Sequence, residues 1–122
     1  MKNQNINFKN KNYNYSIIIG KNTINVLPKK IKSLCPKTKN IALIIDKKIP
    51  NKLRVNLKKK LRNYNILVLP LEASEKNKSL NQVNYFLKFL LSKNFNRSDL
   101  VNGVGGGITG DIAGFVASIF KR

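Results

Sequence analysis

The sequence of 122 residues predicts an α/β fold with a mainly parallel sheet. Short apolar runs alternate along the chain with helix-like patterns, and a glycine cluster joins the last run to the last helical pattern. The runs are continuously apolar, which is typical of strands that are covered on both faces. Alternating strands and helices form such a sheet through right-handed crossovers.

The pattern of residues near the N-terminus predicts an antiparallel hairpin. Its two β-like stretches cover residues 6–8 and 13–19, with a polar connection at 9–12 between them. Gly20 ends the hairpin, and residues 23–34 read as a short helix with Pro28 in its first turn. The hairpin therefore precedes the alternating part of the chain.

Three strand and helix pairs follow. The predicted strands are 41–45, 66–69 and 100–104, and Pro70 is expected to end the second of them. Leucines at 53, 57 and 61 indicate one helix, and a strongly amphipathic pattern after Ser79, a plausible N-cap, indicates the next. The last helix is expected to start near residues 109–111 and to be buried. We predict one domain, 1–122, with a Rossmann-like, doubly wound sheet behind an N-terminal hairpin.

The net charge of +19 raises the question of nucleic-acid binding. All lysines but Lys121 are spread over residues 2–93, only four arginines occur, and residues 99–120 contain neither type. This distribution indicates a compositional bias, so we expect no specific nucleic-acid partner and only weak, salt-sensitive attraction to polyanions.

No apolar run approaches the roughly 18 to 20 residues of a membrane span, and the N-terminus lacks the apolar core of a signal peptide. We expect a cytoplasmic protein with no membrane partner.

The chain contains no histidine, and its single cysteine, Cys35, is assigned no role. It therefore lacks the ligands of most catalytic zinc sites and the commonest general acid and base, so we assign no metal ligand and no catalytic residue.

The glycine cluster is the strongest indication of a binding site. Gly105, Gly106 and Gly107 place no side chain between the backbone and a bound group, and the helix that follows offers unpaired amides to an anion. The pattern predicts a nucleotide site. The alternative is a tight strand-to-helix turn that binds nothing.

Ligands of parallel sheets bind beyond the carboxyl ends of the strands. Three of the five carboxylates, Asp46, Glu75 and Asp111, lie at those places, and Lys78 could face a phosphate. Structural alternatives remain open for each. Asp46 forms a turn equally well, Asp111 would favour the helix dipole by roughly 0.3–1 kcal/mol from the first turn, and Glu75 with Lys78 would form an exposed pair.

These residues resemble one family, the 3-dehydroquinate synthases, in its N-terminal NAD-binding half. Residues 105–117 are similar to the family's Gly-Gly-Gly-x-x-Gly-Asp-x-x-Gly-Phe-x-Ala segment, and residues 75–80 are similar to its Glu-x-x-Lys-Ser-Leu. The segments 15–20 and 41–46 fit the same order. Glycine triplets also occur in iron-dependent alcohol and glycerol dehydrogenases, but the Gly-Asp-x-x-Gly-Phe continuation favours the synthases and related sugar-phosphate cyclases.

The resemblance implies an NAD site. It would place Glu75 and Lys78 at the ribose and nicotinamide side, Asp46 near the adenosine, and Arg122 at a substrate phosphate, across a dimer interface. The pyrophosphate and neighbouring groups would be held by the segment of Gly105, Gly106, Gly107, Ile108, Thr109, Gly110 and Asp111.

The family also uses a divalent metal, zinc or cobalt. Its ligands are carried by a larger C-terminal domain, which this sequence lacks. The implied reaction converts 3-deoxy-D-arabino-heptulosonate 7-phosphate to 3-dehydroquinate and phosphate in the shikimate pathway, in aromatic amino acid biosynthesis. The enzyme class would be a carbon–oxygen lyase, and we expect the chain alone to be inactive.

Two departures from the family pattern stand out. Ala73 and Ser74 replace an Asp-Gly pair before Glu75, which would strain the loop if it needs a positive φ, and Gly103 interrupts the last strand.

Three interpretations result. The first is half of a split 3-dehydroquinate synthase, or a truncated one, with a separate C-terminal-domain polypeptide and a homodimer as expected partners. The second is the NAD-binding half of another sugar-phosphate cyclase. The third is a basic nucleic-acid-binding or structural protein.

Overall fold

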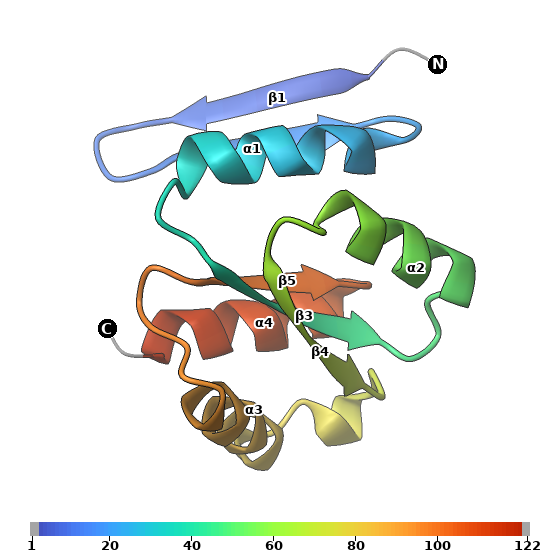
Figure 1. Cartoon of the computed structure of the whole chain (residues 1–122), viewed down its shortest axis with the longest axis vertical. Helices are drawn as coiled ribbons and strands as arrows, with labels where there is room; N and C mark the ends of the chain where they lie inside the picture. Colours follow the sequence, from blue (N-terminus) through green and yellow to red (C-terminus); the bar gives the residue numbers. More distant parts are fainter. Residues whose placement is uncertain (1–2, 121–122) are drawn as a thin grey trace.

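The computed structural model describes residues 3–120 and contains two separate sheets (Figure 1). An antiparallel hairpin is formed by β1 (Gln4–Lys9) and β2 (Asn14–Ile19). A parallel sheet is formed by β3 (Asn40–Asp46), β4 (Asn65–Leu71) and β5 (Leu100–Val104). The α/β class, the N-terminal hairpin and the parallel sheet are confirmed.

The described residues also form four α-helices and two short 3₁₀ helices, of which the last α-helix follows the final strand. The α-helices are α1 (Leu27–Leu34), α2 (Asn51–Lys60), α3 (Leu80–Ser92) and α4 (Gly107–Ile119), and the 3₁₀ helices are η1 (Thr23–Val26) and η2 (Glu75–Asn77). Among residues 3–120, no helix combines the length and the apolar character that crossing a membrane requires.

The central strand of the parallel sheet is β3, and the strand order is β4-β3-β5. Its five residues 41–45 are all buried, as their continuous apolar run predicts. The chain passes from β3 to β4 on one side and then returns across β3 to β5 on the other. The order of strands therefore reverses between β3 and β5, and that point is where such sheets bind ligands.

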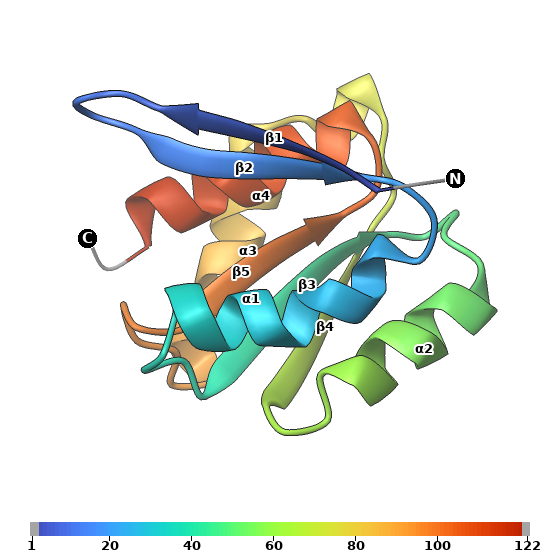
Figure 2. The same cartoon turned by 90° about the horizontal axis from the view of Figure 1, so that it is seen from above.

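Helices cover both faces of this sheet (Figure 2). On one face, Ala42 and Ile44 of β3 pack with side chains of α3 and α4, including Phe86 and Val116. On the other face, Ile41 and Leu43 pack with Ile31 of α1 and with Leu57 and Leu61. Successive strand residues point to opposite faces, so one apolar strand supplies two cores. The doubly wound arrangement is confirmed.

The predicted end of the second strand was wrong, because β4 continues through Pro70 to Leu71. Since β4 lies at the edge of the parallel sheet, one of its sides pairs with no further strand. A proline, which has no N–H to donate, is tolerated on that side. The predicted helix 23–34 was also partly wrong, since it begins as η1; Pro28 does lie in the first turn of α1.

The last helix differs from its prediction in two ways. It begins at Gly107, before the expected residues 109–111, with Gly106 as its N-cap. It is also covered on one side only. Its buried residues are Thr109, Ile112, Ala113 and Val116, whereas Phe115 and Ile119 are each 47% exposed.

The hairpin leaves apolar side chains uncovered. Its register pairs Phe8 with Tyr15 and Ile6 with Ile17, so these four residues lie on one face. The rings of Phe8 and Tyr15 stack with centroids 5.1 Å apart, yet both residues are exposed.

Candidate functional site

The glycine loop (residues 105–107) lies at the point where the strand order reverses. It follows β5 directly, and Asp46 ends the neighbouring strand β3. The two strand ends are in close contact, because a Cβ atom built on Gly105 would lie 3.1 Å from the Cβ of Asp46. The structure thus brings together two of the predicted site segments.

Gly105 must be a glycine for two reasons. Its φ of +155° is a backbone conformation that residues with a side chain rarely adopt. A Cβ at this position would also lie 2.6 Å from Oγ1 of Thr109, well inside van der Waals contact. The loop is therefore shaped by a close approach between the end of β5 and the first turn of α4.

Gly103 has a different function from the one the sequence indicated. We expected it to weaken β5, but it keeps its place in the register opposite Ile44. A Cβ on Gly103 would lie only 2.8 Å from the Cβ of Ala113. Its missing side chain lets α4 pack directly on β5, and this packing sets the position of the helix N-terminus.

The front of the loop is open. Cβ atoms built on Gly106, Gly107 and Gly110 would meet no atom within 4 Å. No side chain caps the start of α4, and the amide of Gly110 makes a helical bond to the Gly106 carbonyl at 3.0 Å. The amides of the first turn precede any such bond, so they are directed toward this open space. The arrangement fits an anionic group, because amides and the positive end of the helix dipole both face it.

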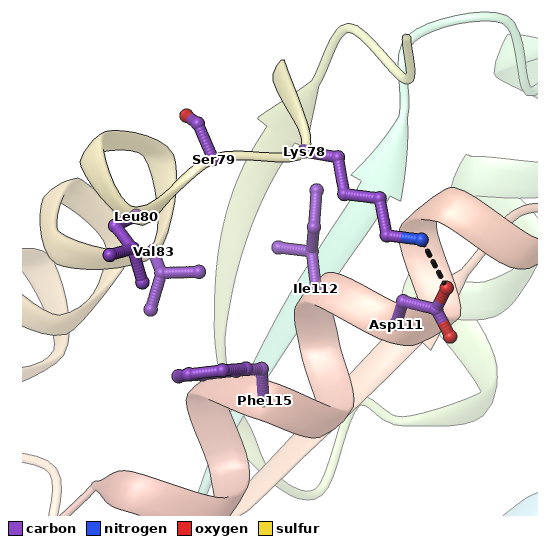
Figure 3. A pocket seen from close by; sticks show the side chains of 7 residues that line it. All are labelled: Lys78, Ser79, Leu80, Val83, Asp111, Ile112 and Phe115. Carbon is purple, nitrogen blue, oxygen red and sulfur yellow. Dashed lines mark hydrogen bonds and ion pairs between the residues drawn. The ribbon is translucent and has the colours of Figure 1, made fainter. Parts of the chain in front are cut away.

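The other two predicted segments meet in an ion pair. Nζ of Lys78 donates a hydrogen bond to Oδ2 of Asp111 at 2.9 Å, across the gap between η2 and α4 (Figure 3). The hydrogen bond and the charge of Asp111 raise the pKa of Lys78 above its ordinary value, with a smaller contribution from Glu75. Lys78 is therefore a cation at neutral pH, and it is held next to the glycine helix.

This ion pair and the start of α4 contradict two of the structural alternatives: the pair between Glu75 and Lys78, and the position of Asp111 in the first turn of the helix. Among the described residues, Lys78 forms its ion pair with Asp111 and not with Glu75. Asp111 does not lie in the first turn of α4, since the helix begins four residues earlier. The carboxylate thus contacts a lysine from another segment.

The loop before Glu75 is not strained. Ser74 has an extended backbone, φ −145° and ψ 159°, and its hydroxyl accepts a hydrogen bond from the Asn77 amide at 3.3 Å. Ser74 therefore caps η2, and the segment does not need the glycine that the family pattern has there. Glu75 is the first residue of η2 and is exposed.

Asp46 does form a turn. Its Oδ1 accepts a hydrogen bond from the Lys48 amide at 3.0 Å, and its carbonyl accepts one from Arg54 at 3.3 Å. Its Oδ2 accepts no hydrogen bond from the described residues, so one oxygen remains available at the strand end. Arg122, the predicted substrate contact, lies outside the described residues.

A cavity of about 260 Å³ adjoins the ion pair (Figure 3). Apolar side chains from the start of α3 and from α4 line it, with Lys78 and Asp111 at one side: these are Leu80, Val83, Ile112 and Phe115. No spacing in the sequence marks these lining residues as one group, because they come from two different helices. Leu80, the first residue of α3, is 74% exposed.

Asp99, a carboxylate without a predicted role, joins the starts of the strands, away from the glycine loop. It accepts hydrogen bonds from the amides of Lys39, Asn40 and Asn96 and from the Asn40 side chain. Burial raises the pKa of Asp99, but the hydrogen bonds from Asn40, Asn96 and Lys39 outweigh it and hold the pKa below its ordinary value. No pattern of residues around Asp99 in the sequence indicated that it would join the strand starts.

Within residues 3–120, no group of three or more His, Cys, Asp or Glu side chains could hold a metal ion.

The fold is shared with two solved structures of 2-deoxy-scyllo-inosose synthase. One matches 97% of this chain and 33% of its own, with a TM-score of 0.77 and 20% identity. The other, a complex with carbaglucose-6-phosphate, NAD⁺ and Co²⁺, matches 98% of this chain and 32% of its own, with a TM-score of 0.78 and 19% identity. The chain therefore has the fold of the matching part of 2-deoxy-scyllo-inosose synthase.

Sequence relatives give the family. Residues 68–122 match the model of the 3-dehydroquinate synthase N-terminal region. The 3-dehydroquinate synthase of Pelagibacter ubique is 44% identical over 88% of this chain, and that of Buchnera aphidicola is 39% identical over 91%. The chain belongs to the 3-dehydroquinate synthase family, as the resemblance predicted. It spans 29% and 30% of the length of these two relatives.

Proposed function

We propose that this chain is the NAD-binding part of a 3-dehydroquinate synthase, which converts 3-deoxy-D-arabino-heptulosonate 7-phosphate to 3-dehydroquinate and phosphate. The observation that carries the proposal is the open glycine loop at the strand reversal, in front of an uncapped helix N-terminus. Its support from relatives is the identity of 44% to a 3-dehydroquinate synthase.

The proposed roles follow the placement of the residues. The pyrophosphate would lie before α4, facing the amides of the glycine loop and of Ile108 and Thr109. Lys78 would offer its charge to a phosphate, and Glu75 would face the ribose. The free oxygen of Asp46 would accept a hydrogen bond from a hydroxyl at the adenosine end.

NAD would supply hydride transfer to and from the substrate. The metal of the family has no ligand group in the described residues. We therefore assign metal and substrate binding to further protein, either a separate polypeptide or additional sequence. A homodimer and a cytoplasmic location are also part of the proposal.

A second candidate is the same part of another sugar-phosphate cyclase. The shared fold with 2-deoxy-scyllo-inosose synthase supports it, but the identity of 19–20% to that enzyme is well below the 44% found for a 3-dehydroquinate synthase. This difference favours 3-dehydroquinate as the product. The net charge of +19 keeps nucleic-acid binding as a third candidate, of another class.

The test is a calorimetric titration of NAD into the purified chain, in which we expect saturable binding. Gly106→Val should abolish it, because the new side chain enters the space before the helix, where a Cβ atom would meet no other atom within 4 Å. The matched control is Gly114→Val, which places the same side chain in open space further along α4. Asp111→Ala should weaken binding by releasing Lys78 from its position.

The outcomes separate the candidates. Equal binding by the Gly106→Val and Gly114→Val variants would place NAD elsewhere and contradict the proposed site. No binding by the unmodified, folded chain would contradict the proposed cofactor. Tight binding of RNA or DNA that survives moderate salt would favour the third candidate, since attraction by net charge alone falls steeply with salt.

A further inference from the structure

The hydroxyl of Thr109 is buried without a hydrogen-bond partner. Thr109 is 0% exposed, and its Oγ1 is one of two buried side-chain atoms that lack a partner among the described residues. A buried hydroxyl without a partner costs free energy, since it has lost its hydrogen bonds to bulk water. Valine would have nearly the same shape without this cost, so the hydroxyl needs an explanation.

A threonine in a helix ordinarily donates to the carbonyl three or four residues before it. For Thr109 these are the carbonyls of Gly106 and Gly105. The Gly106 carbonyl already accepts the amide of Gly110 at 3.0 Å. A carbonyl can accept a second hydrogen bond, but neither of these two accepts the Thr109 hydroxyl in this structure. The Gly106 carbonyl is held in the helix by its bond to Gly110, whereas the Gly105 carbonyl belongs to the loop, so it is the one that can turn toward Thr109.

The loop is built so that this bond can form. Thr109 lies directly beneath Gly105, since Oγ1 would be 2.6 Å from a Cβ there. The Cβ of Asp46 would lie 3.1 Å from the same point. Gly105 and Gly106 have no side chains, so the peptide unit between them can rotate about its two flanking bonds at little steric cost.

We infer that Thr109 is a positioning residue for the dinucleotide-bound form of the glycine loop. When a pyrophosphate lies before α4, the peptide between Gly105 and Gly106 turns its N–H outward to the anion. Its carbonyl then turns inward and accepts the hydrogen bond of Thr109. The inference rests on the proposed NAD site and gives a role to the Thr109 hydroxyl, which is too deeply buried to touch the ligand itself.

In this arrangement the hydrogen bond from Thr109 to the Gly105 carbonyl forms only when the dinucleotide is bound. In the free protein the hydroxyl is unpaired, and in the bound protein it stabilises the loop conformation that presents an extra amide. A group that stabilises the bound form alone increases affinity. A group with a purely structural role would stabilise both forms and leave the affinity unchanged.

The test compares Thr109→Val and Thr109→Ser with the unmodified chain. NAD affinity is measured by calorimetry, and thermal unfolding is measured without NAD. We expect Thr109→Val to bind NAD roughly three- to tenfold more weakly, which is the effect of one hydrogen bond, while its unfolding temperature is unchanged or higher. Thr109→Ser, which keeps the hydroxyl, should bind within about twofold of the unmodified chain.

Ser118→Ala is the matched control. Ser118 lies on the same helix, and its hydroxyl donates to the Phe115 carbonyl at 2.7 Å, so this variant also removes a helical hydroxyl, but away from the loop. It should leave NAD affinity unchanged. The amide resonance of Gly106 should shift on NAD addition in the unmodified chain and shift less in Thr109→Val.

Three results would overturn the inference. Equal NAD affinity of Thr109→Val and the unmodified chain would show that the hydroxyl pairs in neither state or in both, for example with a bound water. A lower unfolding temperature of Thr109→Val with unchanged affinity would show a structural role. If the unmodified chain binds no NAD, the proposed function fails, and this inference fails with it.

Discussion

At the scale of single residues, the glycines of this chain are not equivalent. Gly105 is required by its backbone conformation and by Thr109, and Gly103 is required by Ala113. Gly106, Gly107 and Gly110 face open space. The first two are therefore needed for folding, and the last three leave room for a ligand.

Substitution by alanine should affect stability differently in these two groups of glycines. Gly105→Ala should lower the free energy of unfolding by about 1–3 kcal/mol, since it combines backbone strain with a steric clash. Gly106→Ala should change it much less, because its φ of −85° suits any residue. Urea denaturation of both variants measures the difference. Equal losses would show that the positive φ of Gly105 is not maintained in solution.

Asp99 should make stability depend on pH in the acid range. Its pKa is lower in the folded protein than in the unfolded chain, so its contribution is complete above the unfolded value, about 3.9, and is lost as pH falls through the folded value. Asp99→Asn should lower stability at pH 7 by about 1–2 kcal/mol, because an amide accepts fewer hydrogen bonds. Thermal unfolding between pH 2 and 7 should then show a flatter profile for the variant. Parallel profiles would assign the acid dependence to another carboxylate.

At the scale of helices and strands, the sequence predicted the elements well and their ends less well. The apolar run at 41–45 forms a strand covered on both faces, as predicted, and Ser79 caps α3 as expected, accepting the Gln82 amide at 3.2 Å. The error at Pro70 arose because its effect depends on which strand lies at the edge, and that is a property of the assembled sheet. The early start of α4 was missed because glycines carry no helix signal of their own.

The segments that make up the candidate site were predictable from the sequence, but the contacts between them were not. Strand ends, glycines and the sparse carboxylates located Asp46, Lys78 and Asp111. The pairing of Lys78 with Asp111 joins residues 33 positions apart, so no local spacing reveals it. The unpaired hydroxyl of Thr109 likewise depends on burial, which exists only in the folded chain.

The contact between α4 and β5 should be sensitive to one methyl group. Gly103→Ala would bring two Cβ atoms to 2.8 Å and should force α4 away from the sheet, at a cost of about 1–3 kcal/mol. The shift would also move the helix N-terminus, so NAD affinity should fall together with stability. Ala113→Gly in the same chain should restore part of both. Failure of this second substitution to restore either would place the clash elsewhere.

The hairpin should be the least protected strand pair. Its residues are exposed along nearly their whole length, whereas 41–45 are buried, so local opening of the hairpin exposes little new apolar surface. Amide hydrogen exchange should therefore be faster in β1 and β2 than in β3. Similar protection in all three strands would indicate that the hairpin is covered in solution, for example by a second copy of the chain.

At the scale of the whole molecule, uncovered apolar surface lies on both the hairpin and α4. Phe8, Tyr15 and Ile17 are exposed on the first, and Phe115 and Ile119 on the second. We expect the isolated chain to bind a hydrophobic dye, and the fluorescence to fall in Phe115→Ser. The same substitution at Lys88, Lys88→Ser, is a control on the polar surface of α3. A monomeric chain that binds no dye would contradict this expectation.

The ion pair between Lys78 and Asp111 has a consequence for how an anion would enter. Both side chains are exposed, 45% and 63%, so either can change its partner while staying in water. A phosphate would join Asp111 as a second partner of Lys78, since an ammonium group has three N–H donors, and Asp111 would keep the lysine in position throughout. Neither state would leave a charge stranded in an apolar environment, so the lysine would gain and lose the phosphate with a low barrier in both directions.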